Sequence, residues 1–381
     1  MTFGTEARRR GKCGLEMNRA YRYLSSAFSR KRVLVTGHTG FKGSWLSLWL
    51  KELGAEVIGY ALDPYTPRDN FVLNRLSQKI TDIRGDIRDV RRLRSVFRRY
   101  SPEYVFHLAA QPIVRISYAK PKETFDINVG GTVNIFECCR ITKSVRVIIN
   151  ITSDKCYENK EWVWGYREND PVGGYDPYSS SKGCSELITA AYRKSFFNPS
   201  DFSKHEKALS SARAGNVIGG GDWAKDRIIP DCVRALEKKQ PIQVRNPCSV
   251  RPWQYVLEPL GGYLLLAARM NASPKKYCGA WNFGPEGTSI SKVQEIVESA
   301  IKCWGSGSWK PVGVLSERHE ASMLVLDINK AKLDLAWKPC LTLAEAVKNT
   351  IGWYKARQNR QDLSAFCRSQ IHNYMDRMII R

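Results

Sequence analysis

Three side chains with different chemistry stand next to each other in the segment TSDKCYE (152–158). Ser153 carries a hydroxyl, Asp154 a carboxylate and Lys155 an ammonium. They follow the apolar run VRVIINI (145–151), which is typical of a buried parallel strand. Ligands of open α/β sheets bind just beyond the carboxyl ends of such strands. The triplet is therefore a candidate catalytic group, and a structural ion pair at a strand end is the alternative.

A tyrosine and a lysine form a second candidate pair, in YSSSK (178–182). Tyr178 and Lys182 are four residues apart, so a helix would place them on one face. Neighbouring positive charges favour the phenolate, so we expect a lowered pKa for Tyr178. A phenolate near neutral pH can act as general base for an alcohol proton. A surface pair without function is the alternative.

Glycines recur in TGHTGFKG (36–43), between a predicted strand and a predicted helix. Such a turn lets backbone N–H groups approach a pyrophosphate at the helix N-terminus. Asp63 closes the next predicted strand, where a carboxylate binds an adenosine ribose and favours NAD over NADP. Arg68 is the alternative, since it could accept a 2′-phosphate. The turn residues predicted to bind NAD are Gly37, Thr39, Gly40, Phe41, Lys42 and Gly43.

Three later stretches fit the same dinucleotide crevice, although each alone is as readily structural. Asp86 ends a predicted strand and suits the adenine amine. HLAAQ (107–111) supplies small residues where backbone must approach the cofactor, and Asn128 lies in a predicted helix near the active site. The further cofactor residues expected are Asp63, Asp86, Ile87, Leu108, Ala109, Ala110, Gln111, Asn128, Tyr178 and Lys182.

Alternating strands and helices must position these residues. Strands are predicted at 32–36, 55–62, 80–86, 104–110 and 145–151, and helices at 41–53, 90–100 and 125–142. This alternation predicts an α/β fold with a Rossmann-like doubly wound parallel sheet. Past residue 200 it weakens, which indicates a smaller mixed α/β C-terminal substrate lobe. We expect an N-terminal extension at 1–30, the NAD-binding domain at 31–205, the partly interleaved lobe at 206–355 and a tail at 356–381.

Composition narrows the class of protein. The 381 residues are 43% hydrophobic and 25% charged, which indicates a packed globular protein. The net charge of +23 fits either a nucleic-acid footprint or a basic surface for anionic ligands. The arginines within 88–100 alternate with apolar residues as on a solvated helix face, and no nucleic-acid motif accompanies them. We therefore expect no nucleic-acid partner.

Targeting and cysteine patterns point to the cytoplasm. No apolar run approaches the ~20 residues that span a bilayer. The basic N-terminus lacks the apolar core of a secretory signal, and Met17 is a candidate natural start. The eleven cysteines contain no CxxC pair, which predicts free thiols in a reducing compartment and no metal site.

Taken together, these motifs resemble the extended short-chain dehydrogenase/reductase family. Longer strings resemble the CDP-glucose members of its nucleotide-sugar 4,6-dehydratases, over about 30–356: TGHTGFKGSWL, HLAAQPIVR, TSDKCYEN, RAGNVIGGGDWAKDRIIPD and RPWQYVLEPLGGYL. The resemblance implies redox-neutral dehydration of CDP-glucose to CDP-4-keto-6-deoxyglucose with recycled, bound NAD. Such lyases serve deoxysugar biosynthesis, including that of lipopolysaccharide O-antigen.

The resemblance also implies roles for single residues. Tyr178 would take the 4-hydroxyl proton, with a hydrogen bond from Ser153. Lys155 would act as base at C5 and Asp154 as acid at the C6 hydroxyl, or the two would share one proton. The implied substrate residues are Asn216, Arg227, Arg251, His319 and Glu320.

A homodimer, formed through helices that include the one bearing YSSSK, is implied as well. Other activities remain open: a 4-epimerase, a reductase or a 4,6-dehydratase acting on another nucleotide sugar. Asp154 and Lys155 argue against the first two, because those reactions need no acid–base pair beside the tyrosine. A non-catalytic nucleotide sensor is an alternative of a different class.

Overall fold

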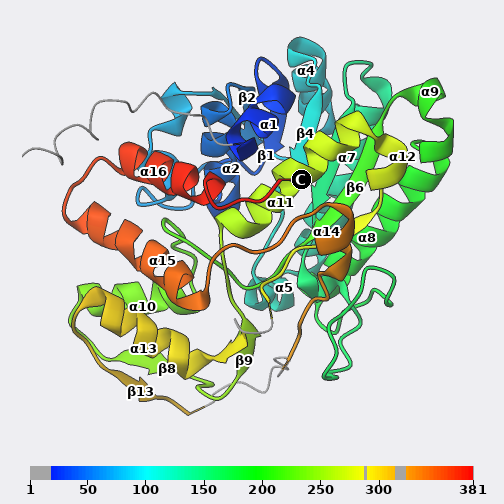
Figure 1. Cartoon of the computed structure of the whole chain (residues 1–381). Helices are drawn as coiled ribbons and strands as arrows, with labels where there is room; N and C mark the ends of the chain where they lie inside the picture. Colours follow the sequence, from blue (N-terminus) through cyan, green and yellow to red (C-terminus); the bar gives the residue numbers. More distant parts are fainter. Residues whose placement is uncertain (1–18, 287–289, 314–322, 381) are drawn as a thin grey trace, which may run out of the picture.

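The computed structural model describes residues 19–286, 290–313 and 323–380 (Figure 1). In this described part, the centre is a seven-stranded sheet in the order β11-β6-β5-β4-β1-β2-β3, with every pair parallel. After β3 the chain crosses to β4 on the other side of β1, which is the switch point of a doubly wound sheet. The predicted Rossmann-like α/β fold is confirmed. The strands are β1 (Arg32–Thr36), β2 (Glu56–Ala61), β3 (Thr81–Arg84), β4 (Tyr104–His107), β5 (Val147–Ile151), β6 (Ala208–Arg213) and β11 (Ala280–Asn282).

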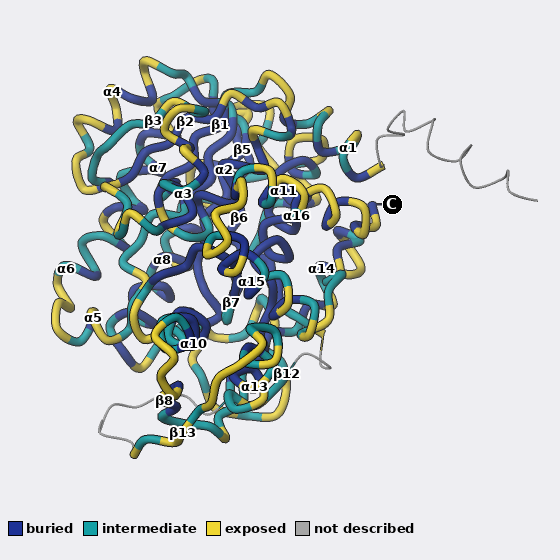
Figure 2. Tube along the Cα trace, turned by 90° about the vertical axis from the view of Figure 1, so that its left-hand side faces the viewer, coloured by how far each residue is buried: buried dark blue, intermediate teal, exposed yellow. Residues whose placement is uncertain are grey.

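Helices cover both faces of this sheet, whose strands are largely buried (Figure 2). Alternate strand residues supply two cores, one on each face. Val33 and Val35 face one side, where they join the larger core, while Leu34 faces the other. Side chains of successive strand residues point to opposite faces, so a strand buried on both sides is apolar throughout. One face carries α1 (Arg19–Phe28), α2 (Phe41–Glu52), α11 (Leu257–Ala272) and α16 (Leu363–Met375); the other carries α4 (Val90–Tyr100), α7 (Gly131–Ile141) and α8 (Pro177–Ser195).

A smaller lobe lies below the sheet in Figure 1. It combines α10 (Ile228–Glu237) and α13 (Val293–Trp304) with two short ribbons, and α15 (Leu343–Gln358) packs against α13. One ribbon is the parallel pair β8 (Ile242–Val244) and β13 (Trp309–Pro311); the other is the antiparallel pair β9 (Val250–Pro252) and β12 (Ile290–Lys292). The parallel pair β7 (Val217–Ile218) and β10 (Gln254–Tyr255) lies where the chain passes between sheet and lobe.

Short helices complete the described chain. They are α3 (Asn70–Leu73), α5 (Val114–Ala119), α6 (Pro121–Phe125), α9 (Phe202–His205), α12 (Pro274–Tyr277) and α14 (Asn329–Asp334), with 3-10 turns η1 (Leu76–Gln78), η3 (Asp154–Cys156) and η4 (Pro199–Asp201) and the π-helical turn η2 (Asp126–Gly130). The turns η2 and η3 both lie close to predicted site residues.

Two segments that were expected to lie outside the two domains contribute to the larger core. Within the expected extension 1–30, α1 buries Ala20, Leu24 and Phe28 in the larger core, against α11. Within the expected tail, α16 buries Cys367, Ile371 and other residues in the same core. A single short amphipathic helix shows little in sequence, because its burial depends on a partner surface that is distant in the chain.

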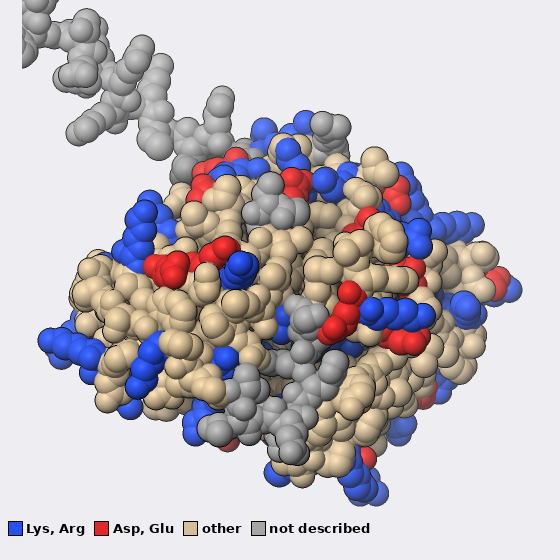
Figure 3. Space-filling model, turned by 90° about the horizontal axis from the view of Figure 1, so that it is seen from below, with Lys and Arg blue, Asp and Glu red and all other residues tan. Residues whose placement is uncertain are grey.

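The basic charge is spread over the face of the molecule seen in Figure 3. On the face seen in Figure 3, Lys and Arg side chains stand in small groups, with acidic and uncharged residues between them. In α4, Leu93, Val96 and Phe97 are buried and the arginines are exposed, so the predicted solvated helix face is confirmed. The absence of a nucleic-acid partner stays a prediction. Within the described ranges, no helix is both long and apolar enough to cross a membrane.

Candidate active site

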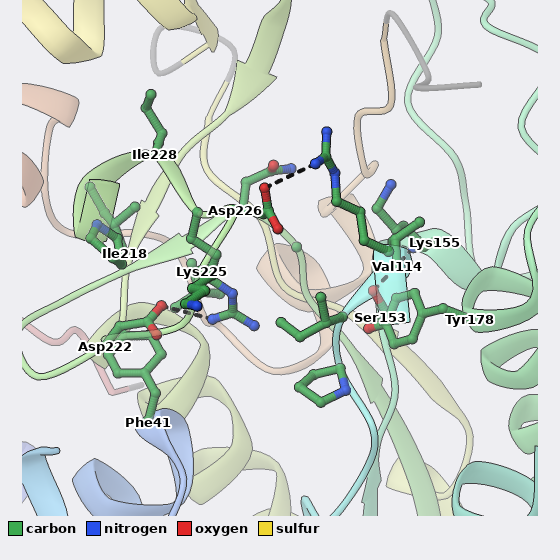
Figure 4. A pocket seen from close by; sticks show the side chains of 18 of the residues that line it. Phe41, Val114, Ser153, Lys155, Tyr178, Ile218, Asp222, Lys225, Asp226 and Ile228 are labelled. Atoms are coloured by element: carbon green, nitrogen blue, oxygen red, sulfur yellow. Dashed lines mark hydrogen bonds and ion pairs between the residues drawn. The ribbon is translucent and has the colours of Figure 1, made fainter. Parts of the chain in front are cut away.

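A cavity of about 1680 Å³ opens between the sheet and the lobe. Its sheet side is lined by residues that directly follow β1, β4, β5 and β6, at the carboxyl ends where ligands of such folds bind. A site for one small molecule usually measures roughly 300–1,000 Å³, so this cavity can hold two ligands side by side. Figure 4 shows Ser153, Lys155 and Tyr178 on one side of it, with residues of the lobe opposite.

The glycine turn has room for backbone but not for side chains. Gly37 has a φ of +74°, and a Cβ there would lie 2.8 Å from the backbone nitrogen of Ala109. A Cβ on Gly43 would lie 2.0 Å from the carbonyl oxygen of Gly37. The N-terminus of α2 therefore opens directly onto the cavity, with Thr39, Gly40, Phe41 and Lys42 in its wall. This arrangement fits a dinucleotide pyrophosphate.

The adenosine end of the predicted site is less complete. The Asp63 side chain is 89% exposed and pairs with Arg84. Near this point the described cavity wall is formed by Ala61, the last residue of β2, and by Leu62. Asp86 and Ile87 do line the cavity, and the Asp86 carboxylate is paired with Arg88 at 2.6 Å. The ribose contact of Asp63 stays a prediction.

Arg68, the alternative anchor for a 2′-phosphate, is engaged elsewhere. Its guanidinium contacts the Glu237 carboxylate at 2.5 Å and lies 3.6 Å from the centre of the Trp223 ring. Arg68 is also outside the described cavity wall. The structure therefore gives no support to the NADP alternative at this residue.

Gln111 and Asn128 lie one layer behind the cavity wall. The Gln111 backbone N–H donates to Asn128 Oδ1 at 2.8 Å, and Asn128 Nδ2 donates to the Gln111 carbonyl at 3.1 Å. Asn128 Nδ2 also donates to Ser181 Oγ on α8, at 2.9 Å. These bonds tie the HLAAQ stretch, of which Leu108, Ala109 and Ala110 line the cavity, to the helix that bears Tyr178.

The triplet Ser153–Asp154–Lys155 follows the end of β5. Ser153 caps the short turn η3, and Asp154 is buried within it. Three donors converge on the Asp154 carboxylate: Ser153 Oγ and the Lys155 backbone N–H, each at 2.9 Å, and Asn216 Nδ2 at 3.3 Å. The Lys155 side chain lines the cavity. The expected grouping of three different functional groups at this strand end is present.

A glycine that the sequence analysis did not single out makes room for Asp154. A Cβ on Gly215 would lie 1.9 Å from Asp154 Oδ2. The next residue, Asn216, adopts a φ of +51° and reaches the same carboxylate. The signal was present in the quoted string RAGN, where Gly215 precedes the predicted substrate residue.

Tyr178 and Lys182 lie on the buried face of α8. The N-terminus of α8 is fixed by two features. Asp176 caps the helix by accepting a hydrogen bond from the Ser179 N–H at 3.0 Å, and Pro177 occupies its first turn. Lys182 Nζ donates to the Ile151 carbonyl at the end of β5, at 3.3 Å. Burial lowers the pKa of Lys182 to about 8, and Cys156 and Glu186 oppose this shift.

The expected lowering of the Tyr178 pKa is wrong, because the protein groups around Tyr178 together raise it. Burial raises the pKa of Tyr178 to about 12, and a hydrogen bond with Ser153 and the Arg227 charge only partly offset it. A neighbouring positive charge favours the phenolate, but the loss of solvent is the larger effect at a fully buried phenol.

Cations crowd the floor of the cavity. Burial lowers the pKa of Lys42 to about 7, and the nearby charges of Lys182 and Arg227 lower it further, against the effect of Asp154. Arg227 is held by Asp222, with 2.8 Å between nitrogen and oxygen. Positive groups gathered in this way favour anionic ligands.

Of the predicted substrate residues, Asn216, Arg227 and Arg251 all line the cavity. His319 and Glu320 lie outside the described residues. The lobe adds a charged group that sequence reasoning missed, in which Asp226 pairs with Arg115 at 3.4 Å and with Arg245 at 3.1 Å. Figure 4 shows Asp226 facing an arginine across the cavity. Arg115 and Asp226 lie within strings quoted for the resemblance, but nothing in their spacing marked them.

The family model described as GDP-mannose 4,6 dehydratase matches residues 34–350, and the chain belongs to this family. Among curated relatives, CDP-glucose 4,6-dehydratase of Salmonella typhimurium (strain LT2) is 51% identical over 346 residues. That match covers 91% of this chain and 96% of the relative.

Solved structures repeat the fold. UDP-glucose 4-epimerase from Thermotoga maritima, solved with UDP-glucose, matches with a TM-score of 0.74 at 22% identity, covering 86% of this chain and 99% of that one. dTDP-glucose 4,6-dehydratase from Bacillus anthracis, solved in complex with NAD, matches with a TM-score of 0.70 at 19% identity, covering 88% and 99%. At these identities the likeness concerns the fold.

Proposed function

We propose that the protein is a nucleotide-sugar 4,6-dehydratase that converts CDP-glucose to CDP-4-keto-6-deoxyglucose. The observation that carries the proposal is the meeting of two groups on one wall of the cavity: the Tyr178–Lys182 pair and the triplet Ser153–Asp154–Lys155. The 51% identity to a CDP-glucose 4,6-dehydratase supports the choice of nucleotide. Such a product belongs to deoxysugar biosynthesis.

The cofactor is NAD, held at its pyrophosphate by the α2 turn and at its nicotinamide ribose by Lys182. When bound, NAD would supply reversible hydride acceptance, from C4 of the sugar and back to C6, so that the net reaction would be loss of water. The bare α2 N-terminus and the steric demands at Gly37 and Gly43 support this assignment.

Tyr178 starts the reaction by removing the proton of the 4-hydroxyl. Ser153 donates a hydrogen bond to that oxygen as it becomes a carbonyl. The positive charge of the cofactor adds to that of Arg227, and both oppose the burial that raises the Tyr178 pKa. Proton transfer by a group placed in this way contributes about 10²–10⁴-fold to a rate.

Lys155 and Asp154 carry out the elimination. The 4-keto group acidifies the C5 proton, which Lys155 removes while Asp154 protonates the departing 6-hydroxyl, so that one water leaves. Lys155 then returns a proton to C5. Because three donors already converge on the Asp154 carboxylate, Asp154 must gain a proton before it can act as the acid. The two neighbouring residues therefore work as a unit that shares one proton.

The substrate pyrophosphate is bound by the lobe wall. Asn216, Arg227 and Arg251 supply amide and guanidinium donors there. His319 and Glu320 are proposed to lie near the sugar nucleotide by resemblance alone. The enzyme works in the cytoplasm, in keeping with an activated-sugar substrate and with the free thiols of the described cysteines.

A homodimer forms through the outer face of α8. This face carries small and apolar side chains, among them Leu187, which is 60% exposed. A Leu187→Glu variant should elute as a monomer in size-exclusion chromatography with light scattering. Leu333→Glu, which changes an 82% exposed leucine on α14, is the matched control and should leave the dimer intact. A monomeric wild-type protein would contradict the proposal.

The product mass tests the activity. Purified protein is incubated with CDP-glucose without added cofactor, and the product is measured by mass spectrometry while absorbance reports NADH. Loss of one water with no net NADH is expected. UDP-, dTDP- and GDP-sugars are tested in parallel. An unchanged mass with CDP-glucose, even after NAD is added, would contradict the proposed substrate and favour another sugar or epimerisation.

A further inference from the structure

A buried ion pair lies beneath the catalytic triplet. Glu186 of α8 and Arg213 of β6 meet at 2.8 Å, and both side chains are 4% exposed. Neither residue lines the cavity, and neither was singled out by the sequence analysis. Taking two charges out of water costs free energy that their attraction recovers only with good geometry and additional hydrogen bonds. The pair therefore calls for an explanation beyond stability.

The two charges bond to residues on either side of the triplet: Thr152, directly before Ser153, and Tyr157, two residues after Lys155. Thr152 Oγ1 donates to Glu186 Oε1 at 2.5 Å. Arg213 donates to the Tyr157 hydroxyl at 2.6 Å, and its guanidinium carbon lies 4.7 Å from the centre of the Tyr157 ring. Both flanking residues are buried. The turn η3 is therefore held at each end by one partner of the same ion pair.

The same carboxylate is fixed to the helix that supplies the other half of the machinery. Glu186 follows Lys182 by one helical turn and Tyr178 by two, so all three lie on one face of α8. The Glu186 charge also acts on Lys182, whose pKa it raises. A shift of Glu186 along or around the helix axis would therefore move Tyr178 and Lys182 with it.

Further hydrogen bonds anchor this network to the sheet. Ser211 Oγ of β6 donates to Glu186 Oε2 at 2.7 Å. The Tyr157 hydroxyl donates to Asn282 Oδ1 of β11 at 2.8 Å. Because β6 and β11 are neighbouring strands of the large sheet, the anchor is rigid. The triplet itself lies beyond the last β5 residue and needs such support.

We propose that Glu186 and Arg213 are positioning residues that hold Ser153, Asp154 and Lys155 in register with Tyr178. The inference rests on the proposed function for the chemistry that the triplet performs. Its physical basis is that a misplacement of about 1 Å at a reacting group costs on the order of 100-fold in rate. Thr152 fixes the Ser153 end of the triplet, and Tyr157 fixes the Lys155 end.

The test removes one link at a time and keeps the ion pair intact. Replacing Glu186 or Arg213 would leave the other charge buried and alone, so a failure to fold would be uninformative. Thr152→Val and Tyr157→Phe each delete a single hydroxyl at nearly constant shape. Thr350→Val and Tyr104→Phe are matched controls, because they delete hydroxyls of buried residues that bond elsewhere.

The two variants should slow different steps. In single-turnover experiments with CDP-glucose, Thr152→Val should slow the appearance of the NADH absorbance about tenfold, because it loosens Ser153. Tyr157→Phe should leave that step within about threefold and slow loss of water about tenfold, because it loosens Lys155. KM should change by less than about threefold in both variants, since the lobe wall is untouched. The controls should match the wild type.

Two results would overturn the inference: wild-type rates in both variants, or equal slowing of both steps together with a lower melting temperature. Hydrogen–deuterium exchange gives a second measurement that needs no substrate. Amides of 153–158 should exchange about tenfold faster in both variants than in the two controls. Equal exchange in variants and controls would contradict the positioning role. A wild-type protein inert toward CDP-glucose would instead contradict the proposed function.

Discussion

The two walls of the cavity are built in different ways. On the sheet wall, Ser153, Asp154, Tyr178 and Lys182 are buried and fixed by hydrogen bonds to strand ends and to one another. On the lobe wall, Asp226 and Arg245 are each more than a third exposed and form an ion pair that solvent reaches. Asp226 also pairs with the exposed Arg115 of α5, which belongs to the sheet side. The sheet wall is preorganised for chemistry, whereas the lobe wall can exchange its ion pairs for those of a ligand.

Substitutions on the two walls should therefore change different kinetic constants. Changes on the sheet wall should lower kcat, because they move or remove groups that act on the transition state. Changes on the lobe wall should raise KM, because they remove contacts made equally by substrate and transition state.

Tyr178→Phe should have the largest effect. It removes the proposed base for the 4-hydroxyl while the ring keeps its packing, so kcat should fall by about 10³-fold or more with little change in KM. Stopped-flow absorbance would show whether any NADH forms on mixing with CDP-glucose. A variant that retains a tenth of the wild-type kcat would contradict the role of Tyr178.

Lys155→Met should separate the two halves of the reaction. It removes the proposed C5 base but leaves Tyr178 and Ser153 in place, so dehydration should fall by about 10²–10⁴-fold while bound NAD is still partly reduced. Product mass and the NADH absorbance would be recorded on the same sample. Normal loss of water would show that the base is another group.

Gly215→Ala probes how closely the sheet wall is packed. The added methyl group would lie 1.9 Å from Asp154 Oδ2, so the carboxylate must move and kcat should fall on the order of 10- to 100-fold. Gly130→Ala is the control, because a Cβ there meets nothing within 4 Å. Steady-state kinetics of both variants decide the point, and equal kcat values would contradict the packing argument.

Arg251→Gln should act on the other wall. It removes a positive charge from the cavity lining, so KM should rise by about tenfold and kcat should stay within about threefold. The rise in KM should shrink at high salt, where charge–charge attraction is screened. A fall in kcat at constant KM would place Arg251 with the chemistry and weaken the comparison of the two walls.

Glu258, which lines neither wall, should affect stability alone. Burial raises its pKa to about 7, so the folded state favours the protonated form. The resulting stability is complete below the unfolded pKa of 4.5 and is lost as pH rises through about 7. Across this window the loss amounts to roughly 3 kcal/mol.

A Glu258→Gln variant should remove this pH dependence, because its amide oxygen can still accept from the backbone N–H groups of Cys340 and Leu341. The melting temperature of the wild type should fall relative to that of the variant between about pH 5 and 8. Parallel curves for the two proteins would contradict the assigned titration.

The local pattern of the chain determined much of the fold and the composition of the site. The strand predicted at 32–36 and the helix predicted at 90–100 have the same bounds in the structure. The glycine turn, the triplet and the tyrosine–lysine pair were all recognisable, because turn, strand end and helix face each depend on neighbours within a few residues.

Features that depend on residues distant in the chain are visible only in the tertiary structure. Burial reversed the pKa shift expected for Tyr178. Packing against elements distant in the chain placed α1 and α16 in the core. The packing of α8 against β6 also joins Glu186 to Arg213 beneath the triplet. The reason is physical: solvent exclusion and ion pairing are set by every element packed around a group, whereas a sequence pattern reports only the neighbours along one helix or strand.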